Sequence, residues 1–577
     1  MAEMDKPAGP RDTGQGAERA PRRGRRRAWP GPWVRGALAI FLLLILALRV
    51  MVWIEVPWAL ALRDTATNNV LTLSLLLASV VTLIVWFCLF SSYAAAARYT
   101  VLGACCGAPA LFFVLFEADG VDGYMNLGWR FRFAPRPDER MPAVAEEAPR
   151  QAGIDLRTES AADFPEFLGP RRRCAVQGIE LETDWQAFPP REVWRRRIGA
   201  GWSAFAARNG YAVTMEQRGP RELVTCYDIV DGKLVWGHGH DARYETELGG
   251  IGPRATPTLT GGKVYALGAL GWLVCLEGAS GNPIWTRDVL KDVNMPPADN
   301  AARMLYGRSN SPLVVDGLVV VGGGGPLDGT AHALIAYDAK TGQPRWKSGA
   351  GYPSYSSPTV ATLCGVRQIL SLDEKHVRGY AIENGRVLWE YSFSESATSD
   401  RGPNVAQPVA LPGDRVLVSN GYFDGGMVIE LHRDADGAFR PSFVWQEPGE
   451  VKTKFTNVTI FGDHIYCLSD GIFQCVRWED GQRMWKRGRY GHGQILRVGG
   501  SILVQNEFEK LTLVAADPAR HVELSEIDML AGKTWNNLCL YGDKLLIRND
   551  REAVCFRLAL KTADNDKSPA GAATDAP

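Results

Sequence analysis

The sequence predicts an all-β fold, an eight-bladed β-propeller with four-stranded antiparallel blades, preceded by a membrane anchor of about three transmembrane helices. The first observation is a phrase of strand, turn and strand that ends in tryptophan and recurs along the chain. Repetition at about 50 residues is typical of propellers and other repeat architectures. The second observation is a group of three apolar stretches near the N-terminus, each long enough to cross a bilayer.

The repeat is clearest at Leu334–Trp346, LIAYDAKTGQPRW, where Thr341-Gly342 forms the turn between two strands. Glycine supplies the positive φ that reverses the chain at low cost. Further copies end at Trp236, Trp285, Trp389, Trp445 and Trp485. A pair of strands precedes each copy, so that one unit is a four-stranded sheet of about 45 residues, the size of a propeller blade.

Eight such units can be counted from their first strands. These begin at Trp202, Ala255, Ser311, Ser357, Gln407, Asn457, Gln494 and Asn536. Prolines 257, 312, 358 and 408 open four of them, as suits the first residue of an edge strand. The last unit, Asn536–Leu558, supplies only three strands, and Glu192–Gly199 resembles the missing one. We therefore expect this N-terminal strand to close the ring, which removes the exposed edges that an open solenoid or two separate sandwiches would leave.

Composition narrows the class of protein. The 577 residues carry 64 basic and 64 acidic side chains, and this zero net charge argues against a nucleic-acid-binding protein. Four of the eleven cysteines, Cys226, Cys275, Cys475 and Cys555, occupy the same slot in different repeats. Because equivalent atoms of different blades lie too far apart for a disulfide, we expect these thiols to be free and to act as small hydrophobic side chains.

Three predicted membrane spans lie at Gly36–Ile54, Val70–Phe90 and Tyr99–Phe116. A cluster of arginines between Arg22 and Arg27 precedes the first span. By the positive-inside rule this cluster keeps the N-terminus in the cytoplasm, and three crossings then place everything after Phe116 outside. We expect a multi-pass protein of the inner (cytoplasmic) membrane with its propeller in the periplasm or outside.

The predicted domains are a basic cytoplasmic tail (1–35), three transmembrane helices (36–116), a linker (117–163), the propeller (164–560) and a disordered tail (561–577). The linker is predicted from its prolines and mixed charges. The tail is predicted from its lack of apolar periodicity.

The repeated phrase resembles the tryptophan-docking motif of pyrroloquinoline-quinone (PQQ)-type propellers. In that family the tryptophan packs against the next blade. The resemblance covers about 192–560, and the family includes the quinoprotein dehydrogenases and the outer-membrane assembly protein BamB. Phe164–Arg173, FPEFLGPRRR, followed by Val193–Phe205, is also similar to the start of propellers described simply as PQQ-binding-like.

The resemblance to quinoprotein dehydrogenases implies a vicinal disulfide stacked on the quinone, and Ca²⁺ held by carboxylate and amide groups beside a catalytic Asp. The only adjacent cysteines, Cys105-Cys106, fall in a predicted span, and no C-x-x-C-H haem motif occurs. We therefore expect no catalytic residue and no cofactor, although PQQ with Ca²⁺ stays open as an alternative.

Two other motifs give only weak signals. His238 and His240, with Asp241 beside them, do not complete a metal coordination shell, because no further ligand can be assigned from the sequence. We therefore expect no metal site here. The two histidines are predicted to be exposed to solvent or hydrogen-bonded within their loop. Gly322–Gly325 precede no helix, and a hairpin is favoured over an anion-binding loop.

A candidate binding surface lies on the face where the long inter-blade loops and the second-to-third-strand insertions gather, because loops on a rigid scaffold commonly carry binding residues. Arg254 and Arg308 precede neighbouring first strands, and two convergent guanidiniums would suit a carboxylate or another planar anion. The alternative is an Arg–Glu network that only holds the loops. The predicted site is Glu216, Gln217, Arg218, Arg254, Tyr306 and Arg308.

Two function classes follow. The first is a membrane-anchored extracytoplasmic propeller that acts as a binding or scaffold protein at the cell envelope, similar to BamB. Its partner would be an envelope protein or a small anionic ligand, and not nucleic acid. The alternative is a quinone-dependent oxidoreductase or small-molecule sensor that uses the same face of the propeller.

Overall fold

The computed structural model describes residues 28–51, 62, 64–144, 153–393, 403–422 and 424–561. The chain divides into two compact units, Met1–Ala47 with Thr72–Phe113, and Leu48–Leu71 with Val114–Pro577. Most of the predicted N-terminal tail, and all but Lys561 of the predicted C-terminal tail, lie outside the described residues.

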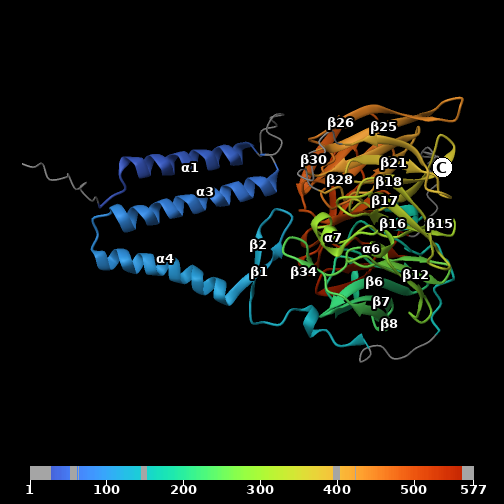
Figure 1. Cartoon of the computed structure of the whole chain (residues 1–577), viewed down its shortest axis with the longest axis horizontal. Coiled ribbons are helices and arrows are strands. Elements are labelled where there is room, and N and C mark those ends of the chain that lie inside the picture. The colour runs from blue at the N-terminus through green and yellow to red at the C-terminus, as the bar shows by residue number, and fades with distance from the viewer. Residues whose placement is uncertain are drawn as a thin grey trace, which may run out of the picture. The chain divides into compact units, whose positions relative to one another are not determined.

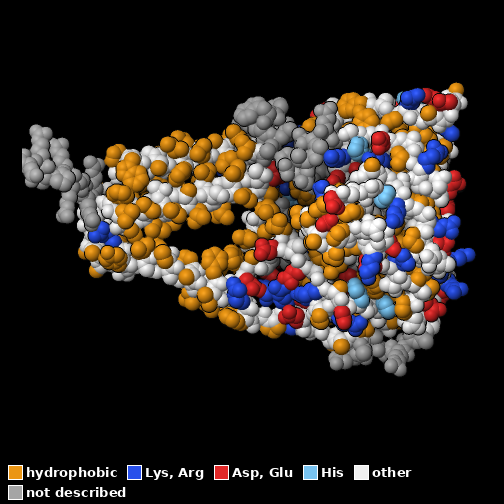
Figure 2. All heavy atoms as spheres, in the orientation of Figure 1, with side chains coloured by type: hydrophobic (Ala, Val, Ile, Leu, Met, Phe, Trp, Pro, Cys, Tyr) orange, Lys and Arg blue, Asp and Glu red, His pale blue; other side chains and the backbone are white. Residues whose placement is uncertain are grey.

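The first unit is helical. Its elements are α1 (Pro32–Met51), α3 (Thr65–Val85) with its continuation η2 (Trp86–Phe90), and α4 (Ala95–Leu115). Each of these three α-helices has one end in the second unit. Among the described residues, three helices are long and apolar enough to cross a membrane, Pro32–Met51, Thr65–Phe90 and Ala95–Leu115. Hydrophobic side chains dominate their surfaces (Figure 2). These helices match the three predicted spans.

The second unit is a β-propeller (Figure 1). The described residues form eight blades, seven of four strands and one of five. Blades one to four are β5 (Ala206–Arg208), β6 (Tyr211–Arg218), β7 (Arg221–Asp228), β8 (Leu234–Asp241); β11 (Thr258–Thr260), β12 (Lys263–Leu267), β13 (Trp272–Glu277), β14 (Pro283–Asp288); β15 (Leu313–Val315), β16 (Leu318–Gly324), β17 (His332–Asp338), β18 (Pro344–Ala350); and β19 (Thr359–Leu363), β20 (Val366–Leu372), β21 (His376–Tyr380), β22 (Val387–Ser392).

The remaining blades follow the same antiparallel order. They are β23 (Val409–Leu411), β24 (Arg415–Asn420), β25 (Gly425–Arg433), β26 (Phe439–Glu447); β27 (Thr459–Phe461), β28 (His464–Ser469), β29 (Ile472–Arg477), β30 (Arg483–Arg489); β31 (Gln494–Val498), β32 (Ser501–Gln505), β33 (Phe508–Ala515), β34 (Glu523–Lys533), joined by β3 (Ala175–Val176); and β35 (Cys539–Tyr541), β36 (Lys544–Arg548), β37 (Glu552–Arg557), β4 (Arg191–Arg197).

The ring closes as predicted. The N-terminal strand β4 pairs antiparallel with β37 and completes the eighth blade, with Trp194 opposite Cys555. A second N-terminal strand, β3, adds in parallel to β31 at the inner edge of the seventh blade. Both ends of the propeller chain therefore meet in neighbouring blades, and the expected alternatives of an open solenoid or two sandwiches are excluded.

The repeated tryptophan joins six of the eight blades to the next. Six of these side chains donate their indole N–H to a backbone carbonyl oxygen of the following blade at 2.8–3.2 Å: Trp194, Trp236, Trp285, Trp346, Trp445 and Trp485. Trp389 instead donates to Gln368 Oε1 of its own blade. The ring of Trp346 covers Gly385 in the turn of the next blade, where φ is +72° and a Cβ would lie 2.5 Å from the ring. Only glycine satisfies both demands there.

The small residue at the repeated cysteine position is also explained by the tryptophan. Cys226, Cys275 and Cys475 each lie directly opposite the tryptophan of their own blade. In the fourth blade the slot is Gly379, where a Cβ would lie 2.2 Å from Trp389 Nε1. The slot is therefore small because the indole fills the space beside it. The described cysteines are free.

The segment just before the first blade reaches the innermost strands around the propeller axis. Arg172, on η4 (Pro170–Arg172), donates to the carbonyl oxygens of Ser311 at 3.2 Å and Pro358 at 2.8 Å, and also to Pro312. The residues before the predicted prolines link the blades: Ser311 N donates to Ser357 Oγ at 2.9 Å, for example. Phe167, three residues after the predicted start of the propeller, is one of the residues that line the cavity described below.

The predicted linker contains ordered structure. Residues 117–163 include most of a β-hairpin, β1 (Phe116–Val121) and β2 (Leu127–Phe131), and the short η3 (Asp138–Arg140). Further short elements are β9 (Glu245–Thr246), β10 (Gly250–Ile251), α6 (Val289–Asp292) and α7 (Pro297–Arg303), all in the long inter-blade loops. The tip of the β1–β2 hairpin reaches the propeller axis and forms part of the site described below.

Candidate functional site

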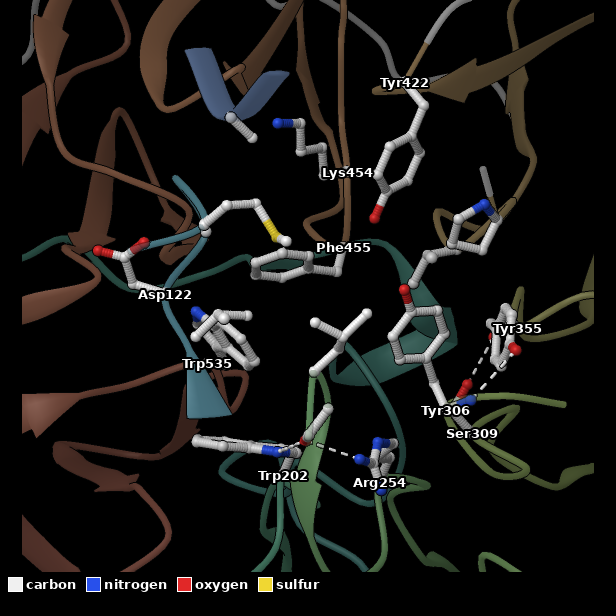
Figure 3. A pocket seen from close by; sticks show the side chains of 18 of the residues that line it. Asp122, Trp202, Arg254, Tyr306, Ser309, Tyr355, Tyr422, Lys454, Phe455 and Trp535 are labelled. Carbon is white, nitrogen blue, oxygen red and sulfur yellow. Dashed lines mark hydrogen bonds between the residues drawn. The ribbon is translucent and has the colours of Figure 1, made fainter. Parts of the chain in front are cut away.

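A cavity of about 510 Å³ lies on the propeller axis. The blades supply most of its wall, and the start of α3 and the tip of the β1–β2 hairpin supply the rest (Figure 3). All of these residues belong to the propeller unit. The side chains that matter most are Asp64, Val70, Leu71, Asp122, Met125, Trp202, Arg254, Tyr306, Tyr355, Tyr422, Lys454, Phe455, Trp535 and Asn537.

Aromatic rings form a continuous stretch of the wall. The centroids of Trp202 and Trp535 lie 5.0 Å apart, and those of Phe455 and Trp535 lie 4.8 Å apart. Each of the three residues precedes the first strand of a blade, so that its side chain is held close to the axis. Such contiguous rings favour a ligand with a large apolar or planar surface.

Three tyrosines line the wall, Tyr306, Tyr355 and Tyr422. Tyr306 and Tyr355 pack edge to face, with centroids 5.5 Å apart, and Tyr306 N donates to the Tyr355 hydroxyl at 3.3 Å. The hydroxyls of Tyr306 and Tyr422 point into the cavity (Figure 3), and within the described chain neither has a hydrogen-bond partner. Burial raises the pKa of each of these three tyrosines, so that the hydroxyls stay protonated and available as donors.

Arg254 lines the cavity and supplies a positively charged side chain. Its guanidinium donates to the carbonyl oxygens of Gly252 at 2.6 Å and Gly249 at 2.7 Å, and lies 4.8 Å from the Tyr244 ring centroid. Burial lowers its pKa, but an arginine keeps its charge at neutral pH. Within the described ranges no carboxylate lies within ion-pair distance of Arg254. The nearby charge of the buried Glu222 carboxylate acts on Arg254 and favours its charged form, without a direct ion pair.

Lys454 is balanced instead. Its Nζ lies 2.7 Å from Asp64 Oδ2 and 3.1 Å from Asp470 Oδ1, and the side chain is only 3% exposed. Burial opposes its charge, but the two carboxylates prevail and raise its pKa. Asp64 also accepts the backbone N–H of Thr67 at 2.9 Å and so caps the start of α3. One ion pair thus holds the first turn of α3 against the sixth blade.

The hairpin tip is held by a second buried carboxylate. Glu507 accepts the N–H of Gly123 at 2.6 Å, the indole N–H of Trp535 at 2.9 Å and the N–H of His492 at 2.9 Å. Lys533 donates to the Val121 carbonyl oxygen at 2.7 Å. These contacts fix the hairpin over the axis, where Val121, Asp122, Gly123 and Met125 become part of the cavity wall.

The predicted site residues divide into two groups. Arg254 and Tyr306 line the axial cavity. Glu216, Gln217 and Arg218 lie in β6 rather than in a loop, and all three are buried. Glu216 pairs with Arg218 at 2.8 Å and accepts Gly199 N at 2.6 Å, so this pair joins the first blade to the closing strand.

Arg308 does not reach the cavity. Its side chain is fully buried and donates to Asn300 Oδ1 at 3.1 Å and to the carbonyl oxygens of Gly322 and Gly323 at 2.9 and 2.7 Å. Burial lowers its pKa to about 10. Arg308 and Arg254 therefore do not converge on one described cavity, and Gly322–Gly323 direct their carbonyl oxygens to an arginine rather than their N–H groups to an anion.

The His238 and His240 side chains belong to β8 and are half-buried. Both pack on the Trp272 ring, with centroid distances of 5.8 and 3.9 Å. Burial lowers the pKa of His240 to about 4. Among the described residues no group of three or more His, Cys, Asp or Glu side chains could hold a metal ion.

The sequence analysis missed Trp202, Phe455, Trp535 and Lys454 as cavity residues. A usable signal existed, because these positions, like Arg254 and Tyr306, fall within about five residues before or at a predicted first strand. No signal in the sequence indicated that Asp64 and the hairpin tip would complete the wall, because they come from outside the repeat array.

The fold defines the class, an eight-bladed β-propeller whose axial cavity is lined in part by segments N-terminal to the blades. Comparison with known proteins agrees. The family model described as "Outer membrane protein assembly factor BamB" matches residues 220–487, which confirms the resemblance predicted from the repeated phrase over that range.

Curated relatives match part of the chain, and solved structures match its fold. Quinohemoprotein alcohol dehydrogenase ADH-IIG of Pseudomonas putida is 29% identical over 135 residues, which are 23% of this chain and 18% of that protein. The structure of quinohemoprotein alcohol dehydrogenase from Comamonas testosteroni matches with a TM-score of 0.50 at 11% identity, covering 75% of this chain and 85% of that one. BamB from Moraxella catarrhalis matches with a TM-score of 0.47 at 12% identity, covering 64% and 99%. The chain thus spans less than a fifth of the curated relative, and the structures show the fold alone.

The cavity residues do not fit PQQ with Ca²⁺ as the family holds it. The described wall carries two carboxylates, Asp64 and Asp122. Asp64 is bound to Lys454, and Asp122 accepts the backbone N–H groups of Tyr124 at 2.9 Å and Asn126 at 2.8 Å. Cys105 and Cys106 lie in α4, away from any cavity residue in the sequence. Neither a vicinal disulfide nor a carboxylate free to bind a cation faces the described cavity.

Proposed function

We propose that this protein is a membrane-anchored binding protein of the cell envelope, whose propeller lies outside the cytoplasm and whose ligand site is the axial cavity. The observation that carries the proposal is the cavity itself. Its volume is in the range of small-molecule sites, and seven aromatic side chains belong to its wall. Within the part of the chain that the structure describes, Arg254 forms no ion pair and the Tyr306 and Tyr422 hydroxyls have no hydrogen-bond partner.

Two observations support the envelope location. Three apolar helices precede the propeller, and the arginine cluster at positions 22–27 favours a cytoplasmic N-terminus. The matching family model describes an outer-membrane assembly factor, which agrees with a place at the cell envelope. A scaffold role with an envelope protein is compatible with the same anchor.

A quinone-dependent oxidoreductase is the second candidate, favoured by the similarity to quinohemoprotein alcohol dehydrogenases. When bound, PQQ would supply hydride or electron transfer. The poor fit of the cavity side chains to that group places this candidate second.

The test uses two tryptophan substitutions in the full-length protein. Val405 lines the cavity, so Val405→Trp should fill it, whereas Val230 is 68% exposed and Val230→Trp is the matched control. A panel of small organic anions, with PQQ plus Ca²⁺ as one member, is screened by ligand-induced thermal shift. The proposal expects a ligand that stabilises the wild type and the control but not Val405→Trp. A ligand that stabilises all three equally would place the site elsewhere, and a PQQ-specific absorbance would favour the oxidoreductase.

A further inference from the structure

The β1–β2 hairpin exposes large hydrophobic side chains on one of its faces. Side chains alternate between the two faces of a strand, so that Leu127, Trp129 and Phe131 of β2 share one face, where they are 49%, 42% and 45% exposed. Phe133, just beyond the strand, is 66% exposed, and its ring centroid lies 5.5 Å from that of Phe131. We call these four side chains the aromatic face. Exposed apolar surface of this kind commonly marks a contact with a partner or a membrane.

The opposite face of the hairpin is occupied by ion pairs. Arg130 of β2 pairs with Glu117, which lies directly opposite in the strand register. Asp119, two residues further along β1, lies 3.1 Å from Arg551 in the eighth blade. The polar face is therefore engaged within the chain and held to the propeller. The exposed apolar side chains belong to the other face.

The aromatic face lies where the chain leaves a candidate membrane span. β1 begins at Phe116, the residue directly after the span Ala95–Leu115 of α4 (Figure 1). Phe131 is opposite Phe116 in the hairpin, and their ring centroids lie 5.8 Å apart. The head-group layer adds about 5–7 Å on each side of the hydrocarbon core of a bilayer. The chain itself therefore holds Phe131 close to that layer.

We propose that the aromatic face docks on the lipid bilayer, with its side chains in the layer between head groups and acyl chains. Aromatic rings are enriched at this boundary, and Trp, Phe and Leu form the buried face of elements that lie in it. The occupant is lipid rather than another protein because the span leads directly into the hairpin. A protein partner would have to displace the lipid around the end of that span.

The docked hairpin would also orient the propeller. Its tip is held by Glu507, which accepts Gly123 N at 2.6 Å, and by Lys533, which donates to Val121 O at 2.7 Å. Both propeller residues lie on the face that carries the inter-blade loops and the axial cavity. Docking of the aromatic face therefore keeps this propeller face at the membrane surface. The inference does not depend on which ligand the cavity binds.

The test uses photocrosslinking of the full-length protein in phospholipid vesicles. The photoreactive residue p-benzoylphenylalanine replaces Phe131 or Phe133, and mass spectrometry identifies what each position attaches to on irradiation. Val230 is the matched control, because it is 68% exposed in the turn between β7 and β8, at the opposite end of its blade from the inter-blade loops. We expect phospholipid adducts at both hairpin positions and none at the control position.

Trp129 provides a second measurement that needs only a conservative substitution. Phospholipids brominated near the head-group end of the acyl chain quench indole fluorescence on contact. The quenched signal should be smaller in Trp129→Phe than in the wild type. It should keep its wild-type size in Trp478→Phe, because Trp478 lies in the turn between β29 and β30, at the same end of its blade as the control position. The melting temperature of each variant checks its fold.

Three results would overturn the proposal. Crosslinks from the hairpin positions to a second copy of the chain, in place of lipid, would make the aromatic face an interface between copies. No adducts together with unchanged quenching in Trp129→Phe would leave the face in water. Equal lipid adducts at Val230 would show that contact with lipid is not specific to the hairpin. None of these results bears on the axial cavity, whose ligand screen is a separate test.

Discussion

Closure of the ring by β4 gives a sharp test through Trp194. Its indole N–H donates to Ile229 O at 2.8 Å, and its ring lies over Gly232, where a Cβ would lie 2.6 Å from the ring. Trp236 makes the equivalent contacts in the first blade, with Gly278 O at 3.0 Å and Gly281, and is more deeply buried at 5% exposure. Trp194 and Trp236 therefore form a matched pair. Trp236 lies on a strand that directly follows the other strands of its blade in the sequence, whereas Trp194 lies on the N-terminal strand that completes the last blade.

The magnitudes follow from burial. Truncating a fully buried tryptophan costs about 3–5 kcal/mol, so that we expect about 4 kcal/mol for Trp236→Ala. Trp194 is only partly buried, and its local cost should be nearer about 3 kcal/mol. However, β4 lies at the start of the propeller sequence and pairs with β37 at its end. Release of β4 would therefore also expose the edge of β37. We therefore expect Trp194→Ala to lose at least as much stability as Trp236→Ala.

The assay is thermal melting of the full-length protein together with limited proteolysis. Trp194→Ala should show cleavage in 191–197 or 552–557 before the blades unfold, whereas Trp236→Ala should show no early cleavage there. The reasoning is refuted if Trp194→Ala loses less stability than Trp236→Ala, as its smaller buried area alone would give, and shows no early cleavage. Closure by β4 would then add no stability beyond the contacts of one side chain.

Three further predictions concern charge and orientation. Burial raises the pKa of Glu222 to about 7 from 4.5, so the fold loses stability as pH rises between those values. Over that interval the stability of Glu222→Gln relative to the wild type should increase by up to about 3 kcal/mol. A difference in melting temperature that does not change with pH would contradict this prediction. Lys454→Met leaves Asp64 and Asp470 buried without a cation and should cost about 3–5 kcal/mol, with partial recovery in the Lys454→Met/Asp64→Asn double variant; additive losses would show that the pair is not coupled. Protease added to intact spheroplasts should digest the propeller, and protection of the propeller with digestion of the N-terminal tail would reverse the topology.

The repeat array was predictable because its signals are local. The turn glycines, the docking tryptophans and the small slot filled by Cys226 or Gly379 each follow from contacts within one blade or with the next. Ring closure was predictable for a related reason, since the eighth blade lacked a strand and the N-terminal segment offered one. The three apolar helices followed from composition alone.

The candidate site was only partly predictable. Arg254 and Arg308 occupy similar places in the sequence, just before first strands, yet one lines the cavity and the other is buried against Asn300 and two glycine carbonyls. The difference arises from α7, which the sequence analysis did not predict and which supplies Asn300. The contributions of Asp64 and Gly123 depend on contacts with Lys454 and Glu507, hundreds of residues away, and no local pattern encodes such pairings.

The most direct test of the binding function is native mass spectrometry of the full-length protein purified from its own membrane in a mild detergent. The account predicts one small-molecule adduct per chain on the wild type and on Val230→Trp, and none on Val405→Trp at an unchanged melting temperature. The same adduct on all three proteins would contradict the axial cavity as the binding site.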